Sequence, residues 1–415
     1  MSSYIIEGGR KLMGEMDVSG SKNASLPIIA ATILNKGISR IQNVPDIRDV
    51  KMMCSILEIL GCKIKRGENI LEIDARDLAD SEIPQHLMHE MRSSVIIAGA
   101  LLGRLHECKF TYPGGCEIGS RPINLHLEAF KQLGVELHED NGFIKCETPK
   151  LVGTEIVLDF PSVGATENIM LASTLAEGTT YIKNVAREPE IKNLEDFLNS
   201  MGANISGAGS NTIVIKGVKE LHDTEFEIIP DRIEAGTYLC MAAITGGELK
   251  LNHVNAEHIS SVIHKLKQMN CRIGISKESI TLKTPHALSG INIKTMPYPG
   301  FPTDMQSQFV TLLSLAKGTS IVVENIFENR FKYVNELLKM GANITVEGKA
   351  AIIQGVKKLS ASKLEAKDLR GGAALIIGAL SAEGTSEITG IDYIERGYEK
   401  LVKKLSILGA KIEKA

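Results

Sequence analysis

The 415-residue sequence has no large excess of charge of either sign, no apolar run of membrane-spanning length and no paired-cysteine motif. Its 47 Lys and Arg residues nearly balance its 50 Asp and Glu residues. This balance does not favour nucleic acid or an anionic membrane as a partner, so any anion site must be local. No apolar segment of signal-peptide type opens the sequence. We therefore expect a cytoplasmic protein of about two domains with an ordinary hydrophobic core.

Common cofactor and metal motifs are also missing. The sequence contains neither the GxxxxGK[ST] phosphate loop nor a GxGxxG fingerprint after a strand, and it has no histidine cluster with metal-ligand spacing. Seven cysteines occur without a CxxC pair, which indicates reduced thiols rather than disulfides or zinc. We predict no cofactor and no metal. Six cysteines lie in apolar helix or strand patterns and are expected to be structural: Cys54, Cys62, Cys108, Cys146, Cys240 and Cys271.

The seventh cysteine has a different environment. Cys116 lies in PGGCEIGSRP, behind two glycines and five residues before Arg121. A glycine-rich loop with a nearby cation favours an exposed thiol whose pKa is lowered, and such thiols are reactive. This environment favours a reactive role for Cys116 over a structural one.

The sequence repeats itself six times. A helix end, a glycine or asparagine and a new strand recur in LEILGCKI, FKQLGVEL, FLNSMGANI, LKQMNCRI, LLKMGANI and LSILGAKI. Glycine, or asparagine as second choice, suits a left-handed helix C-cap. The predicted cap residues are Gly61, Gly134, Gly202, Asn270, Gly341 and Gly409. Each repeat of about 70 residues predicts two helices and several strands, so the fold class is α+β.

Two domains of three repeats each are the simplest arrangement. We predict an N-terminal domain over residues 22–229 and a C-terminal domain over 1–21 plus 230–415, with the break near Pro230 and Asp231. Because the last repeat ends short, the opening strand YIIEG is expected to complete it. The active site is expected in a cleft between the domains.

Polar residues recur at the helix starts. The apolar first helices begin near Lys22, Arg92, Thr166, Arg232, Asp304 and Arg370, and the second helices near Arg48, Arg121, Arg187, His258, Arg330 and Arg396. Any one of these is compatible with a solvated helix end. Together they suggest an anionic ligand, because a cation at a helix N-terminus opposes the helix dipole. Asp304 is the exception: it is either an N-cap or an ionised base among cations.

These residues resemble a known family. SGSKNASLP, MRSS, PGGCEIGSRPINLHL, PSVGATEN, PGFPTDMQ, ENRF, DLRGGAAL and IDYIERGYE together resemble the UDP-N-acetylglucosamine 1-carboxyvinyltransferases over the whole chain. These enolpyruvyl transferases make peptidoglycan precursors. The resemblance implies two domains, each of three inverse βαβαββ-type repeats in an inside-out α/β barrel. It also implies transfer of the enolpyruvyl group of phosphoenolpyruvate to the sugar 3-hydroxyl, with release of phosphate, through a tetrahedral ketal.

The resemblance also assigns residues. It implies Cys116 as general acid, Asp304 as base, and Lys22 and Arg396 as further catalytic residues. Phosphoenolpyruvate would be bound by Lys22, Asn23, Arg121, Arg330, Arg370 and Arg396. The sugar nucleotide would be bound by Asn23, Arg92, Arg121, Pro122, Ile123, Asn124, Leu125, Phe160, Ser162, Val163, Asp304 and Ile326. Asn124 replaces an aspartate of many relatives, and Phe160 a lysine of some, so contacts to the nucleotide differ from theirs.

Two alternatives stay open. A sister transferase that acts on shikimate 3-phosphate shares the fold and the cation pattern, although the PGGC…SRP loop speaks against it. A non-catalytic scaffold built from α+β repeats would need no exposed thiol and no aspartate among arginines. We expect a monomer whose only partners are its two small-molecule substrates.

Overall fold

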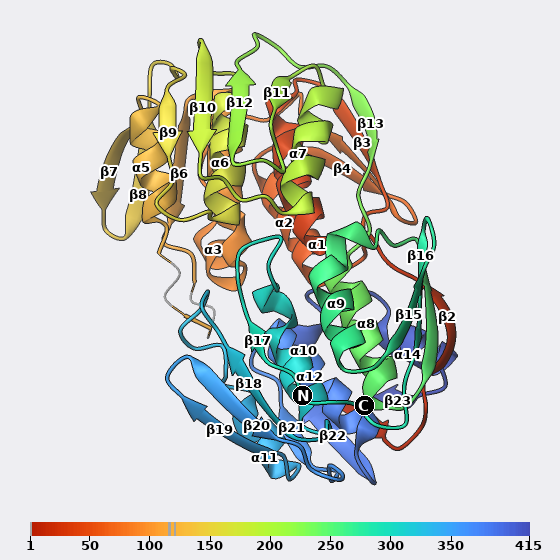
Figure 1. Ribbon diagram of the computed structural model, residues 1–415. Coiled ribbons are helices and arrows are strands. Elements are labelled where there is room, and N and C mark those ends of the chain that lie inside the picture. The colour runs from red at the N-terminus through yellow and green to blue at the C-terminus, as the bar shows by residue number, and fades with distance from the viewer. Residues whose placement is uncertain (1, 115–117, 120–121) are drawn as a thin grey trace. The chain divides into compact units, whose positions relative to one another are not determined.

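The computed structural model describes residues 2–114, 118–119 and 122–415, and it divides into two compact units. The N-terminal unit comprises residues 20–114 and 122–229. The C-terminal unit comprises residues 2–19, 118–119 and 230–415. Figure 1 shows their elements, and each unit is described by itself.

The N-terminal unit contains three sheets in the described part of the chain. Their strand orders are β13-β3-β5-β4, β6-β8-β7 and β11-β12-β10-β9. The strands are β3 (Ile38–Gln42), β4 (Lys63–Arg66), β5 (Ile70–Asp74), β6 (Glu107–Thr111), β7 (Glu136–Asp140), β8 (Phe143–Glu147), β9 (Glu155–Val157), β10 (Thr179–Lys183), β11 (Asn204–Ser206), β12 (Thr212–Lys216) and β13 (Thr224–Glu227). The α-helices are α1 (Lys22–Ala31), α2 (Arg48–Ile59), α3 (Gln85–Glu90), α4 (Ile96–Leu105), α5 (Asn124–Gln132), α6 (Val163–Ser173) and α7 (Pro189–Ser200). The 3-10 helices are η1 (Thr32–Leu34) and η2 (Arg92–Val95).

The C-terminal unit likewise contains three sheets among its described residues, with strand orders β15-β16-β14-β2, β17-β18-β20-β19 and β21-β22-β1-β23. The strands are β1 (Tyr4–Glu7), β2 (Met13–Asp17), β14 (Glu248–Asn252), β15 (Arg272–Ile275), β16 (Ser279–Lys283), β17 (Ile293–Lys294), β18 (Thr319–Val323), β19 (Asn343–Glu347), β20 (Ala350–Gln354), β21 (Lys363–Glu365), β22 (Thr385–Thr389) and β23 (Lys411–Lys414). The α-helices are α8 (Arg232–Ile244), α9 (Ser260–Gln268), α10 (Gln306–Leu313), α11 (Val334–Lys339), α12 (Leu369–Ser381), α13 (Ile391–Ile394) and α14 (Leu401–Ile407). The 3-10 helices are η3 (Glu257–Ile259) and η4 (Thr303–Met305).

One topology recurs in these sheets. A parallel edge strand leads into a buried helix, a central strand, a second helix and an antiparallel pair, as in β17-α10-β18-α11-β19-β20. The β6 sheet has a single parallel bridge, Glu82 to Lys109, in place of the edge strand. Between the units the edge strands are exchanged: β2 precedes α1 but pairs with β14, and β13 precedes α8 but pairs with β3. The chain passes from one unit to the other after β2 and after β13, and residues 118–119 also group with the C-terminal unit.

The predicted helix caps are confirmed. Gly61, Gly134, Gly202, Gly341 and Gly409 have φ between 86° and 108°, and Asn270 has φ of 71°. An L side chain rarely adopts this conformation, which explains why glycine recurs at these positions. The opening strand β1 pairs antiparallel with β22 and β23, so it completes the last repeat as expected.

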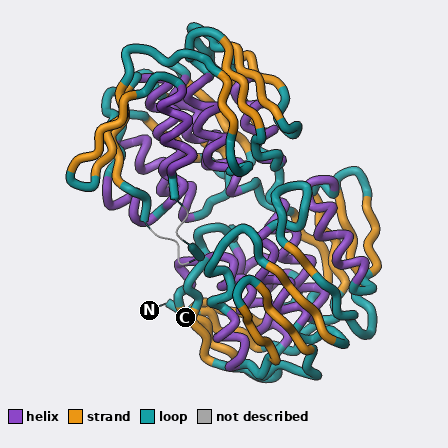
Figure 2. The backbone as a smooth tube through the Cα atoms, turned by 60° about the vertical axis from the view of Figure 1, so that its left-hand side comes forward, coloured by secondary structure: helices purple, strands orange, loops and turns teal. Residues whose placement is uncertain are grey.

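Each unit has its own hydrophobic core. The first helix of each repeat is almost wholly buried, whereas second helices such as α7 and α9 bury one face. In each unit Figure 2 shows helices gathered together with strands around them. The outward positions of the strands alternate with buried ones, which is the pattern of a sheet with one solvated face. No helix in the described residues is long and apolar enough to cross a membrane.

Candidate active site

The first helices of the C-terminal unit, α8, α10 and α12, pack on one another and bring their first turns together. Arg232 begins α8, Asp304 lies in the η4 turn that precedes α10, and Arg370 is the second residue of α12. These positions agree with the sequence pattern. Asp231 and Asp368 cap α8 and α12 by accepting backbone N–H groups, whereas Asp304 makes no such cap.

Asp304 lies between two buried guanidinium groups. Arg330 donates from Nη2 to Asp304 Oδ1 at 2.9 Å, and Arg370 donates to Oδ2 from Nε at 3.2 Å and from Nη2 at 3.0 Å. Both arginine side chains are 4% exposed, while Asp304 is 28% exposed. Because Asp304 is partly exposed, a substrate hydroxyl can approach its carboxylate.

Charge balance in this cluster explains how buried arginines are tolerated. Burial is the largest influence on the pKa of Arg370 and acts to lower it, but Asp304, Tyr398 and Asp231 together outweigh burial, and the net pKa is raised above the ordinary value. Arg370 therefore stays fully charged. Arg330 has a buried Nε–H with no hydrogen-bond partner among the described residues, which makes it a donor suited to an added anion.

The N-terminal unit places Lys22 at the first position of α1, beside Asn23. The Lys22 ammonium lies 3.0 Å from the Asp49 carboxylate, and Asp49 is a buried residue in the first turn of α2. Carboxylates such as Asp49 and Asp304 offset part of the positive charge at these helix starts. Asp49 was not predicted, although its place directly after Arg48 at a helix start was a visible signal.

The other predicted residues of this unit lie at further helix starts. Arg92 opens η2, which leads into α4, and Ser162 caps α6 by accepting from the N–H of Ala165 at 3.3 Å. Val163 is the first residue of α6. Phe160, two residues before Ser162, is 43% exposed and is thus open to a ligand.

Pro122 to Leu125 lead into α5, which begins at Asn124. Pro122 and Asn124 are exposed, while Ile123 is buried. The start of α5 is held by His126, whose Nδ1 lies 2.7 Å from Nδ2 of Asn168 on α6. Asn168 also accepts from the N–H of Gly99 on α4 at 2.7 Å. One buried amide therefore links α4, α5 and α6 beneath these predicted nucleotide contacts.

Glu324 holds the segment that contains Ile326. The sequence analysis did not predict a role for Glu324. The buried Glu324 carboxylate accepts from the N–H of Ile326 at 2.8 Å and from the Thr303 hydroxyl at 2.9 Å. Because Thr303 precedes Asp304, Glu324 fixes the Ile326 loop next to the turn that carries Asp304. Arg396 lies between α13 and α14, two residues before Tyr398, which binds Arg370.

Two predicted residues, Cys116 and Arg121, lie outside the described residues. The neighbouring Ile118 is described, and its carbonyl accepts from the N–H of Asn329 at 3.0 Å in the C-terminal unit. The six remaining cysteines are free and buried, as predicted. Burial raises the pKa of Cys62 and of Cys271 to about 12, so these thiols are not activated. That the two units share one active site remains a prediction.

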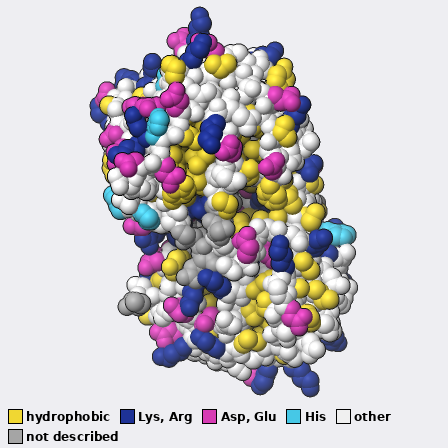
Figure 3. All heavy atoms as spheres, turned by 90° about the vertical axis from the view of Figure 1, so that its left-hand side faces the viewer, with side chains coloured by type: hydrophobic (Ala, Val, Ile, Leu, Met, Phe, Trp, Pro, Cys, Tyr) yellow, Lys and Arg dark blue, Asp and Glu magenta, His cyan; other side chains and the backbone are white. Residues whose placement is uncertain are grey.

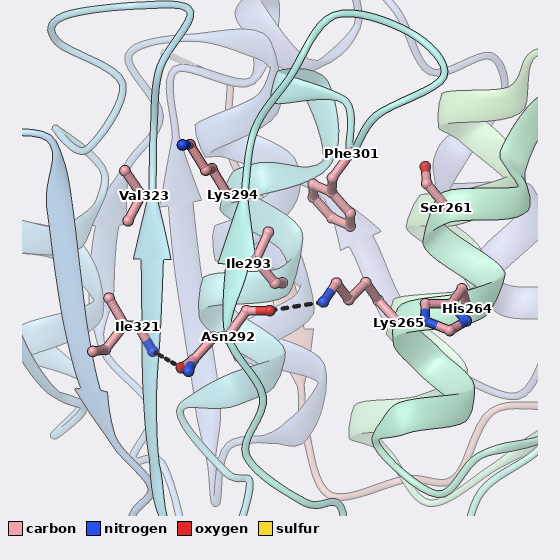
Figure 4. Close-up of a pocket in the computed structure, with 9 residues that line it drawn as sticks. All are labelled: Ser261, His264, Lys265, Asn292, Ile293, Lys294, Phe301, Ile321 and Val323. Carbon is pink, nitrogen blue, oxygen red and sulfur yellow. Dashed lines mark hydrogen bonds between the residues drawn. The ribbon is translucent and has the colours of Figure 1, made fainter.

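A shallow groove of about 460 Å³ lies elsewhere in the C-terminal unit, between α9 and strands β17 and β18. Figure 4 shows Lys265 reaching from α9 to the carbonyl of Asn292, at 2.8 Å, beside the apolar Ile293 and Phe301. None of the predicted site residues lines this groove, and no carboxylate is among its lining residues.

The exposed charges are interspersed. Figure 3 shows basic and acidic side chains mixed over one face of the molecule. Many of them pair across neighbouring strands, as Lys183 does with Glu155 and Lys283 with Glu248. The arginines around Asp304 differ from these surface pairs because they are buried.

Comparison with known proteins identifies the class. The profile of the EPSP synthase (3-phosphoshikimate 1-carboxyvinyltransferase) family matches residues 6–405. The chain is 55% identical to UDP-N-acetylglucosamine 1-carboxyvinyltransferase 2 of Caldanaerobacter subterraneus subsp. tengcongensis, covering 99% of both chains. It is 48% identical to UDP-N-acetylglucosamine 1-carboxyvinyltransferase of Trichlorobacter lovleyi, covering 100% of this chain and 99% of the relative.

Solved structures agree at the level of the fold. The enolpyruvyl transferase NikO from Streptomyces tendae superposes with a TM-score of 0.90 at 24% identity, covering 100% of this chain and 99% of NikO. EPSP synthase from Acinetobacter baumannii superposes with a TM-score of 0.77 at 19% identity, covering 100% of both chains. The fold is therefore that of the enolpyruvyl transferases. By its full-length matches, the chain belongs to the EPSP synthase family of carboxyvinyltransferases.

Proposed function

We propose that the protein is a transferase that moves the enolpyruvyl group of phosphoenolpyruvate to the 3-hydroxyl of UDP-N-acetylglucosamine and releases phosphate. Such a reaction is the first committed step of peptidoglycan precursor synthesis, and we place it in the cytoplasm. The acceptor follows from the relatives, which carry this activity in their names at 46–55% identity over the full length. The observation in the chain itself that supports it is an aspartate held between two buried arginines.

The chemistry needs a base near a hydroxyl and cations near an anion. Asp304 takes the proton of the sugar 3-hydroxyl, whose oxygen forms a bond to C2 of phosphoenolpyruvate. Cys116 delivers a proton to C3 in the same addition, which gives a tetrahedral phosphate ketal. Loss of a C3 proton then restores the double bond as the C2–O bond to phosphate breaks, and phosphate leaves with the electron pair.

The cations bind the two charged substrates. Lys22, Arg121 and Arg396 hold the phosphate of phosphoenolpyruvate, while Arg330 and Arg370 hold its carboxylate through charge-assisted hydrogen bonds. The buried Nε–H of Arg330, which has no partner among the described residues, supports this assignment. Asn23, Arg92, Pro122 to Leu125, Phe160, Ser162, Val163 and Ile326 contact the sugar nucleotide.

The test is phosphate release from phosphoenolpyruvate, measured in parallel with UDP-N-acetylglucosamine, with shikimate 3-phosphate and without an acceptor. Release with the sugar nucleotide alone is expected. Phosphate release with shikimate 3-phosphate alone would agree with the family but refute UDP-N-acetylglucosamine as the acceptor. No release with either acceptor would refute the proposed transferase activity.

The thiol is tested separately. Incubation with the epoxide fosfomycin should add one adduct by intact mass in the wild type and none in Cys116→Ser. An unmodified wild-type chain would contradict the role assigned to Cys116.

A further inference from the structure

A closed ring of hydrogen bonds lies behind the Asp304–Arg370 pair. Arg370 Nη1 lies 3.2 Å from the Tyr398 hydroxyl, which lies 3.0 Å from Thr237 Oγ1. Gln308 Nε2 donates to Thr237 Oγ1 at 3.2 Å and to the backbone carbonyl of Asp304 at 2.8 Å. The Asp304 side chain then returns to Arg370, which closes the ring.

The direction of these hydrogen bonds is determined by chemistry. Arginine has only donors, so the Tyr398 oxygen must accept from Arg370. The Tyr398 proton is then directed to Thr237 Oγ1, because the Thr237 proton is donated to the carbonyl of Ile233 at 2.7 Å. A carbonyl accepts only, so Gln308 must turn its amide nitrogen toward Asp304. Each member therefore has a single consistent orientation.

The ring joins four separate parts of the C-terminal unit. Thr237 comes from α8, Gln308 from α10, Arg370 from α12 and Tyr398 from the segment before α14. Thr237 and Gln308 are 0% exposed, Tyr398 is 3% and Arg370 is 4%. The Tyr398 ring also lies against the guanidinium, with 5.6 Å between Arg370 Cζ and the ring centroid. Water therefore has little access to replace these contacts.

We propose that Tyr398 is a positioning residue. Its hydroxyl, held in place by Thr237 and indirectly by Gln308, sets the orientation of the Arg370 guanidinium toward Asp304 and toward the bound anion. This inference rests on the proposed function for the identity of the anion. The hydrogen bonds within the described chain use three of the five N–H groups of Arg370, one on Nε, one on Nη1 and one on Nη2. With those three directions set, the remaining N–H groups on Nη1 and Nη2 point in fixed directions for a carboxylate oxygen.

The test is Tyr398→Phe in the full-length protein, which removes the hydroxyl and keeps the ring. A hydrogen bond to a charged group supports a roughly tenfold or larger fall in kcat/KM for phosphoenolpyruvate. We expect this fall to come mainly from a higher KM for phosphoenolpyruvate, with a smaller change for the sugar nucleotide. A merely structural role would reduce the active fraction, lowering apparent kcat at unchanged KM.

Tyr238→Phe is the matched control. Tyr238 is a fully buried tyrosine next to Thr237 on α8, and its hydroxyl has no hydrogen-bond partner among the described residues. Its removal should leave both KM values unchanged. If Tyr398→Phe behaves like Tyr238→Phe, the proposal is wrong.

A second variant and a binding assay test the proposal if the first variant does not fold or the protein shows no turnover. If Tyr398→Phe does not fold, Thr237→Val is tested instead, because it removes the group that accepts the Tyr398 proton. An unchanged KM for phosphoenolpyruvate in Thr237→Val would overturn the proposal. If the wild type turns over no acceptor, the proposed function fails, but the ring is still tested by anion binding. The rise in Tm produced by phosphoenolpyruvate or inorganic phosphate should then shrink in Tyr398→Phe and persist in Tyr238→Phe.

Discussion

Replacing Asp304 with asparagine should destabilise the C-terminal unit as well as stop the reaction. The carboxylate faces two guanidinium groups at 2.9 and 3.0 Å, each on a side chain that is 4% exposed. Removing one partner of a buried ion pair costs about 3–5 kcal/mol. Asp304 is 28% exposed and the amide keeps one acceptor oxygen, so we expect the lower end, about 3 kcal/mol. For a unit of this size that corresponds to a Tm lower by roughly 6–12 °C.

Differential scanning calorimetry of wild type and Asp304→Asn in phosphate-free buffer measures this shift. Inorganic phosphate should raise the Tm of the variant more than that of the wild type, at matched ionic strength, because the freed guanidinium groups attract an anion. The control is Glu383→Gln, which breaks an exposed pair with Lys358 whose side chains are 67% and 63% exposed. That variant should lose less than about 1 kcal/mol. An Asp304→Asn variant with the Tm of the control would refute the reasoning.

Three further predictions concern stability and reactivity. Burial raises the pKa of Glu167 well above its ordinary value, so the folded chain keeps a proton that the unfolded chain releases and stability falls as pH rises above about 4.5. Glu167→Gln removes this loss, and its Tm relative to wild type should therefore rise from about pH 5 to pH 9; a constant difference would contradict the shift. Lys404→Met removes the cation that lies 2.7 Å from the buried Glu234 carboxylate. The free energy of unfolding, measured with denaturant, should fall by about 3 kcal/mol, and adding Glu234→Gln should restore much of it. Iodoacetamide at neutral pH should modify one thiol in the native protein and none in Cys116→Ser, and modification of the other, buried thiols would contradict their burial.

Much of the fold could be predicted from the sequence because the patterns that indicate it are local. A glycine or asparagine at each helix end marks a backbone conformation that other residues rarely adopt, and it predicted all six C-caps. The apolar bodies of the first helices predicted their burial, and the short last repeat predicted that β1 completes its sheet. The predicted loop residues Cys116 and Arg121 lie outside the described structure, so their roles stay predictions.

The hydrogen-bond and ion-pair partners of the charged residues could not be predicted from the sequence. Lys22 and Asp49 are separated by 27 positions, and Tyr398 and Thr237 by 161. Sequence reasoning treated Asp304 as either a cap or an isolated acid among cations. In the structure Arg370 of α12 and Arg330 of the segment before α11 both bind it. No pattern within a single helix carries that information.

The sequence by itself determined the repeat, the helix C-caps and the kinds of charge found near the helix starts, because caps, turns and hydrophobic periodicity depend on neighbours along the chain. Some predicted starts are displaced by a few residues, as Arg330 lies four residues before α11 and Arg396 five before α14. Only the tertiary structure decided which charges meet and which stay available to a ligand. Those outcomes depend on distances of about 3 Å between side chains from different helices, and such distances are set when three helices pack into one core.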